Sequence, residues 1–88
     1  MLVDDEVLVR VGLKSLINWN KNGYQIIGEA SNGEDGLKLI EEKRPDIVLT
    51  DIKMPIKDGL VMIEEAQKKN INSKFIVLSS FDEFHLVK

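Results

Sequence analysis

Three carboxylates and one hydroxyl stand at the ends of short apolar runs of the chain. They are Asp4, Asp5, Asp51 and Ser79. Crowded carboxylates repel one another, and a bound cation relieves that repulsion. Mg²⁺ suits a donor set made only of oxygen, and a carboxylate is also a competent nucleophile toward phosphorus. These residue types therefore predict metal-assisted phosphoryl transfer onto one of the carboxylates, with the Ser79 hydroxyl holding a phosphoryl oxygen.

The elements that must bring these groups together alternate between short strands and amphipathic helices. Apolar runs predict strands over residues 1–3, 24–30, 46–50 and 75–78. Apolar residues at helical spacing predict helices over residues 7–19, 34–43 and 60–70, with a fourth beginning at residue 82. This alternation indicates an α/β fold with a doubly wound parallel sheet. The carboxyl ends of parallel strands meet at one edge, so we expect the four polar groups to converge there.

The apolar pattern also predicts which side chains face the core. The dense run of residues 47–49 is typical of a strand covered on both faces. Each predicted helix has one apolar side that should pack inward. The residues expected on these sides are Val9, Leu13, Leu16, Ile17, Leu37, Ile40, Leu60, Ile63 and Ala66.

Composition limits the classes of protein that are compatible with this pattern. The 88 residues carry 12 Lys and Arg against 15 Asp and Glu, a net charge of −3, which argues against electrostatic binding of nucleic acid. There is no cysteine and a single histidine, His85, so any metal should be a hard cation with oxygen ligands. No apolar run is long enough to span a membrane, and no signal peptide is visible. We therefore expect one soluble, cytoplasmic domain.

Three segments of the chain resemble the receiver domain of two-component response regulators. They are Leu2-Val3-Asp4-Asp5-Glu6, Asp51-Ile52-Lys53-Met54-Pro55-Ile56-Lys57-Asp58-Gly59 and Val77-Leu78-Ser79-Ser80. The resemblance covers all 88 residues, and the segments occur in order at the ends of the first, third and fourth predicted strands. Residues 18–33 and 79–84 are similar, more narrowly, to receivers joined to AraC-type helix-turn-helix output domains.

The resemblance implies a role for each candidate residue. Asp51 becomes the phosphoacceptor, and Asp4 and Asp5 become the acidic pair that holds Mg²⁺ together with Asp51. The backbone carbonyl of Lys53 becomes a further ligand of the metal. Ser79 becomes the switch hydroxyl that follows the phosphoryl group.

The resemblance also implies a larger domain than these residues provide. A receiver has five strand–helix units in a flavodoxin-like sheet of strand order 2-1-3-4-5, whereas residues 1–88 reach only the start of the fourth helix. The fifth unit, with the lysine that pairs with the phosphoryl group, is absent from this sequence. We therefore expect residues 1–88 to form an incomplete receiver domain whose fourth strand is an exposed edge. Such an edge should be covered by a homodimer, a swapped element or another chain.

The implied partners follow from the family. A histidine kinase should donate the phosphoryl group, and DNA should be bound only through an output domain that this chain does not contain. No contact with a membrane is expected. The chain should act as a signalling domain that controls transcription rather than as an enzyme.

Two other functions are compatible with parts of the pattern. The first alternative is that residues 1–88, without the lysine, turn over no phosphate and serve only as an interaction or dimerisation module. A Mg²⁺-dependent phosphatase with an aspartyl nucleophile is the second alternative. Such enzymes place an acid two residues after the nucleophile, and the basic residue Lys53 at that position argues against it.

Overall fold

The structure, a computed structural model, describes residues 1–78 of the chain. Strands and helices alternate along these residues. The elements are β1 (Leu2–Val3), α1 (Val7–Leu16), β2 (Glu29–Ala30), α2 (Gly33–Lys43), β3 (Ile47–Asp51), α3 (Gly59–Lys68) and β4 (Lys74–Leu78). The predictions for Ser79 and for a helix beginning at residue 82 lie outside the described residues.

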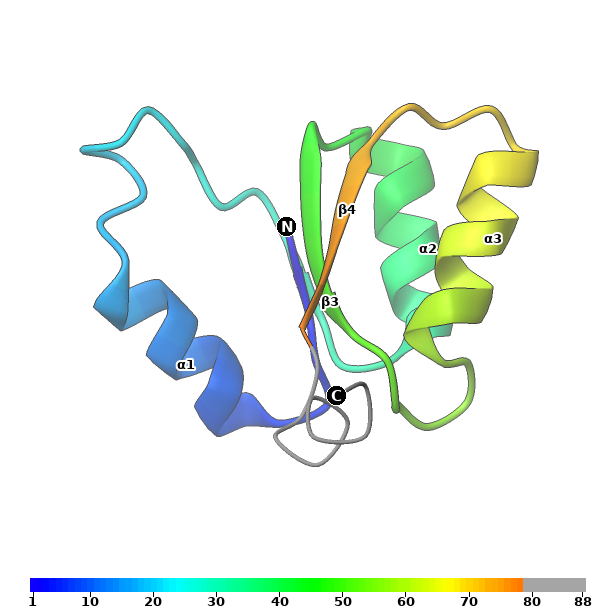
Figure 1. The fold of residues 1–88 in the computed structure, drawn as a ribbon, viewed down its shortest axis with the longest axis horizontal. Coiled ribbons are helices and arrows are strands. Elements are labelled where there is room, and N and C mark those ends of the chain that lie inside the picture. The colour runs from blue at the N-terminus through cyan, green and yellow to red at the C-terminus, as the bar shows by residue number, and fades with distance from the viewer. Residues whose placement is uncertain (79–88) are drawn as a thin grey trace, which may run out of the picture.

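The four described strands form one parallel sheet in the order β2-β1-β3-β4 (Figure 1). Leu2 lies between Glu29 of β2 and Leu49 of β3, and β4 pairs with β3 along its whole length. The predicted parallel α/β sheet and its strand order are therefore confirmed. Because all strands run the same way, β1 and β3 end at the same edge of the sheet.

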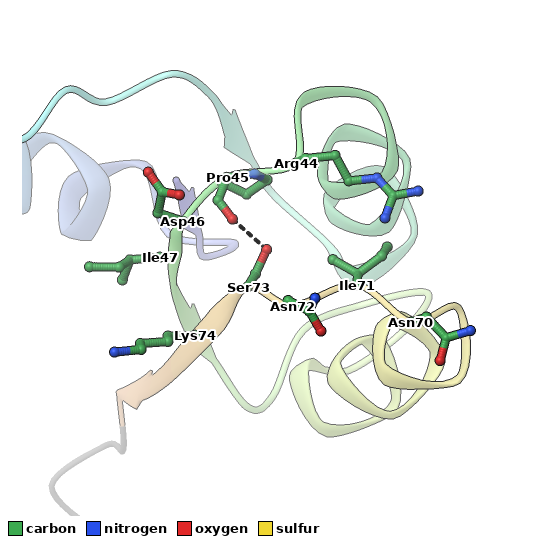
Figure 2. A pocket seen from close by; sticks show the side chains of 9 residues that line it. All are labelled: Arg44, Pro45, Asp46, Ile47, Asn70, Ile71, Asn72, Ser73 and Lys74. Carbon is green, nitrogen blue, oxygen red and sulfur yellow. Dashed lines mark hydrogen bonds between the residues drawn. The ribbon is translucent and has the colours of Figure 1, made fainter.

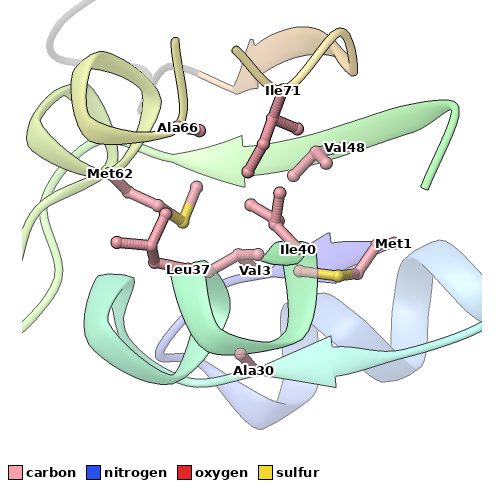
Figure 3. Close-up of a cluster of buried hydrophobic side chains, with 9 residues drawn as sticks. All are labelled: Met1, Val3, Ala30, Leu37, Ile40, Val48, Met62, Ala66 and Ile71. Carbon is pink, nitrogen blue, oxygen red and sulfur yellow. The ribbon is translucent and has the colours of Figure 1, made fainter. Parts of the chain in front are cut away.

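The hydrophobic core lies between the sheet and the pair of helices α2 and α3 (Figure 3). Val3 and Val48 project from the strands, and Ile40 and Met62 meet them from the helices. All four side chains are almost completely buried. Burying one such side chain contributes roughly 1.5–3 kcal/mol, so the packing of this layer stabilises the described residues.

Helix α1 lies apart from the opposite face of the sheet (Figure 1). Within α1, no residue is buried, and Leu16 from its predicted apolar side is 87% exposed. An open cavity of about 680 Å³ separates this part of the chain from Leu49 and Ile76. The prediction that residues 47–49 are covered on both faces is wrong for the described residues, because Ile47 and Leu49 remain partly exposed.

Three further elements differ from their predictions. Strand β2 is only two residues long, because β1 offers only Leu2 and Val3 as ladder partners. Helix α1 ends at Leu16 rather than near residue 19, since Ile17 is extended. Helix α3 turns Met62 and Ala66 inward, whereas Leu60 is exposed.

Two side-chain caps fix where the helices begin. The Asn32 side chain accepts a hydrogen bond from the backbone N–H of Asp35 at 2.8 Å, and Asp58 accepts one from Val61 at 2.8 Å. Such caps typically contribute about 1 kcal/mol each. Among the described residues, no helix has the length and apolar character needed to cross a membrane.

Candidate functional site

Three carboxylates meet at the carboxyl edge of the sheet. Val3 of β1 lies opposite Thr50 of β3, so Asp4, Asp5 and Asp51 follow at adjoining strand ends. One carboxylate oxygen from each lies within 4.8 Å of the other two. The predicted convergence of these three side chains is therefore confirmed.

The first acidic pair consists of one buried residue and one exposed residue. Asp4 is only 5% exposed, and its backbone N–H donates to the carbonyl of Ala30 at 3.0 Å. Its Oδ1 accepts the backbone N–H of Glu6 at 2.9 Å. Asp5 is exposed to solvent. The burial and hydrogen bonds of Asp4 fix the start of the acidic loop, while Asp5 remains accessible to an approaching group.

Asp51 is the last residue of β3 and is partly buried. Its Oδ1 accepts the backbone N–H of Ile52 at 2.8 Å. The hydroxyl of the fully buried Thr50 donates to the Asp51 carbonyl oxygen at 2.9 Å. Both hydrogen bonds fix the orientation of Asp51 relative to the sheet, so its carboxylate is held at the edge where Asp4 and Asp5 lie.

The loop after Asp51 is closed by short backbone hydrogen bonds. The N–H of Gly59 donates to the carbonyl of Ile52 at 2.7 Å, and the N–H of Gly33 donates to the carbonyl of Lys57 at 2.8 Å. These bonds tie the loop both to the start of α3 and to the start of α2. The loop after Asp51 is therefore fixed by backbone hydrogen bonds to both helix starts.

Comparison with known proteins gives matches that extend over the whole chain. The family model for the response regulator receiver domain matches residues 1–88. This chain belongs to the response regulator receiver family. The receiver is 41% identical over 88 residues to the transcriptional regulatory protein YesN of Bacillus subtilis, covering 100% of the chain and 24% of YesN.

Solved structures show the same fold. The REC domain of AraT, a response regulator from Geobacillus stearothermophilus, superposes with a TM-score of 0.88 at 36% identity, over 98% of this receiver and 67% of that chain. A chain in the CheX–CheY–BeF3–Mg²⁺ complex from Borrelia burgdorferi superposes with a TM-score of 0.81 at 30% identity, over 98% of this receiver and 64% of that chain. The predicted receiver fold is thereby confirmed, and the receiver spans about a quarter of the length of YesN.

The acidic cluster of the receiver fits a small hard cation. Its donors are all carboxylate oxygens, the ligand type that Mg²⁺ prefers. Because these oxygens lie within 4.8 Å of one another, the three residues would be able to hold one small ion directly or through its bound waters.

The roles predicted for the other two site residues, Lys53 and Ser79, are not tested by the geometry of the acidic cluster. Lys53 is exposed and lies two residues after Asp51 in the loop. Ser79 follows Leu78 in the sequence and lies outside the described residues. The metal-ligand role of the Lys53 carbonyl and the switch role of Ser79 both stay predictions from the resemblance.

The structure adds two residues that the sequence analysis did not single out. Arg10 of α1 donates from Nη1 to the carbonyl oxygen of Asp4, and from Nε to Glu29 at 3.1 Å. Lys14 also donates to Glu29, at 2.7 Å. The pKa of the Glu29 carboxyl is lowered, mainly by the hydrogen bond from Lys14 and to a smaller extent by Arg10. The four-residue spacing of Arg10 and Lys14 on one helix side was the signal available in the sequence.

A second pocket lies at the opposite edge of the sheet (Figure 2). Its volume is about 480 Å³, and Arg44, Ile47 and Lys74 are among its lining residues. The Ser73 hydroxyl donates to the Pro45 carbonyl across it. Ile47 is the first residue of β3, whereas Asp51 is the last, so this pocket is separate from the acidic cluster.

One residue of the loop has a strained backbone. Ile56 has a φ of 69°, and the Lys57 N–H donates to the Pro55 carbonyl at 2.7 Å around it, as in a γ-turn. A β-branched residue is rarely found at such a φ, and the conformation costs on the order of 1–3 kcal/mol.

We expect Ile56→Gly to raise the free energy of unfolding by about 1 kcal/mol, because glycine adopts a positive φ without steric cost. The Ile56 side chain is 75% exposed, so its removal sacrifices little packing. Urea denaturation measures the change. A variant less stable than the parent protein would contradict strain at this position.

Proposed function

We propose that this receiver accepts a phosphoryl group on Asp51, with Mg²⁺ held by Asp4, Asp5 and Asp51. The observation that carries the proposal is the convergence of the three carboxylates within 4.8 Å at the carboxyl edge of a parallel sheet. Labelling of the full-length protein by a small acyl-phosphate donor tests it. The BeF3 and Mg²⁺ named in the Borrelia complex, which contains a chain of similar fold, support the same chemistry.

The chemistry follows from the nucleophile and its surroundings. A carboxylate oxygen of Asp51 attacks phosphorus, a new P–O bond forms, and the bond from phosphorus to the donor breaks. The Ile52 N–H holds Oδ1 of Asp51 in a fixed orientation for this attack. When bound, Mg²⁺ supplies positive charge that offsets the phosphoryl oxygens beside three carboxylates.

The resemblance to receivers suggests two further residues for the proposed site. The Lys53 backbone carbonyl would add a metal ligand, and the Ser79 hydroxyl would bind a phosphoryl oxygen and report the phosphorylated state. The resemblance to receivers supports both roles. Asp51 is already oriented by its neighbours, so the proposed switch involves the loop and Ser79 rather than the phosphoacceptor.

We infer the partners from the family and from the names of relatives. Receivers of response regulators interact with histidine kinases and with output domains, and YesN is named a transcriptional regulatory protein. A histidine kinase in the cytoplasm would therefore donate the phosphoryl group to Asp51. Control of transcription would act through an output domain, and a homodimer or swapped partner would cover the apolar edge at β4, where Ile76 and Val77 are exposed.

Mg²⁺ affinity gives a direct test of the acidic pair. We expect Asp5→Asn to weaken Mg²⁺ binding by about tenfold or more, because the amide loses the charge that attracts the ion. Amide chemical shifts followed during a Mg²⁺ titration give the dissociation constant.

The matched control is Asp46→Asn. It makes the same change of charge at an exposed residue beside the pocket at the opposite edge of the sheet (Figure 2). We expect its Mg²⁺ affinity to equal that of the parent protein. If the Asp5 variant bound Mg²⁺ as tightly as the parent protein, Asp5 would not be a ligand of the ion.

A further inference from the structure

Helix α1 is connected to the rest of the described structure mainly by polar contacts. None of its residues is buried, and Leu8 and Leu16 are more than 80% exposed. Its side-chain bonds to other elements come from Arg10 and Lys14, both of which reach Glu29 on β2. Because α1 has so little apolar packing, these polar contacts determine the position of its first turn relative to the sheet.

Arg10 alone of these two cations also bonds the acidic loop. Its guanidinium bridges the Asp4 carbonyl, through Nη1, and the Glu29 carboxylate, through Nε. The side chain is only 15% exposed, so the bridge is largely shielded from water. From the other side, the Asp4 N–H is bonded to the Ala30 carbonyl on β2. The peptide planes on both sides of Asp4 are therefore fixed.

We propose that Arg10 is a positioning residue for the cation site, an inference that rests on the proposed function. By fixing the Asp4 carbonyl, the guanidinium sets the direction in which the chain enters Asp5. The carboxylates of Asp4 and Asp5 then face Asp51 before a cation arrives. Ordering the ligands therefore costs less of the binding free energy. Glu29 orients the guanidinium by accepting its Nε–H at 3.1 Å.

The proposal predicts a sign opposite to that of simple electrostatics. Arg10 carries a positive charge close to the proposed ion, and like charges repel. If Arg10 acted only through its charge, its removal would strengthen Mg²⁺ binding. A positioning role predicts that removal weakens binding, because the acidic loop is then free to take other conformations. The direction of the change therefore separates the two effects.

The experiment compares Arg10→Met with Lys14→Met in the full-length protein. Each variant loses one positive charge from α1, but only the first loses a bond to Asp4. We expect Arg10→Met to raise the Mg²⁺ dissociation constant by about tenfold, the usual effect of removing a group that orients a metal ligand. We expect Lys14→Met to leave it unchanged or to lower it. Calorimetry or amide shifts during a Mg²⁺ titration measure both values.

A third variant keeps the charge. Arg10→Lys retains a cation but cannot bridge two acceptors with a planar fork, so we expect weaker Mg²⁺ binding than in the parent protein. A role of charge alone predicts no change. This comparison also decides the question if Arg10→Met fails to fold, which thermal unfolding without Mg²⁺ reveals.

The outcomes separate this inference from the proposed function. Unchanged or tighter binding in both Arg10 variants would overturn the positioning role and leave the phosphoacceptor proposal intact. Absence of Mg²⁺ binding in the parent protein would overturn the cation site itself, and the positioning role with it.

Discussion

Replacing Asp51 by Asn should abolish phosphorylation of the full-length protein by a small acyl-phosphate donor. The amide has no anionic oxygen to attack phosphorus, so the reaction loses its nucleophile rather than a fraction of its rate. The substitution is close to isosteric, and the Asn side-chain oxygen can still accept the Ile52 N–H that Oδ1 accepts at 2.8 Å. The Asp51→Asn variant should therefore keep the fold and the conformation of the loop after residue 51. Intact-mass measurement in the presence of Mg²⁺ detects the loss.

Two controls give this result its meaning. Asp46→Asn removes a carboxylate at the opposite edge of the sheet and should label like the parent protein. Asp5→Asn keeps the nucleophile but weakens the cation site, so its labelling should recover as Mg²⁺ is raised. Labelling that persists in the Asp51 variant would place the phosphoacceptor elsewhere. A parent protein that is never labelled would favour the alternative of an interaction module.

The parallel sheet and the acidic cluster were predictable from the sequence for one physical reason. Short apolar runs separated by amphipathic helices leave few topologies, because each helix returns the chain to the same end of the sheet and successive strands then run in parallel. Parallel strands end at a common edge, and the acids after β1 and β3 meet there because these two strands are neighbours, an order that the resemblance to receivers implied. The cluster of Asp4, Asp5 and Asp51 follows directly from this geometry.

The packing of the opposite face was not predictable in the same way. Helical spacing shows which side of α1 is apolar, but it does not show whether another element lies against that side. Leu16 belongs to the predicted apolar side and is nevertheless exposed. The prediction for α3 was correct for Ala66 but wrong for Leu60, because helical spacing alone does not fix which residue of the first turn faces the sheet; Met62 is buried and Leu60 is exposed.

Contacts to backbone atoms are equally hidden in a sequence. Arg10 bonds a carbonyl oxygen, and every residue has one, so no residue type reveals its partner. The length of β2 depends on how many residues β1 offers, which the composition of residues 24–30 does not show. Such features depend on tertiary geometry rather than on local pattern.

Replacing Gly59 by Ala should destabilise the protein by about 3 kcal/mol, at the upper end of the usual cost of overpacking. A Cβ at this position would lie 2.0 Å from the carbonyl oxygen of Asp51 and 3.1 Å from its carbonyl carbon. The obstacle is backbone, which cannot rotate away as a side chain would. Gly59 is also held in place, because its N–H donates to the Ile52 carbonyl at 2.7 Å. Relief therefore requires a shift of the peptide that carries Asp51.

The matched control for this variant is Gly12→Ala in α1. A Cβ there meets no heavy atom within 4 Å, and alanine favours a helix over glycine by up to about 1 kcal/mol, so stability should rise. The same added methyl group thus has opposite expected effects at the two glycines, and urea denaturation measures both. Because the clash at Gly59 falls on Asp51, Mg²⁺ affinity should fall in that variant and stay unchanged in the Gly12 variant. A Gly59 variant as stable as the parent protein would show that the backbone beneath the phosphoacceptor can move without cost.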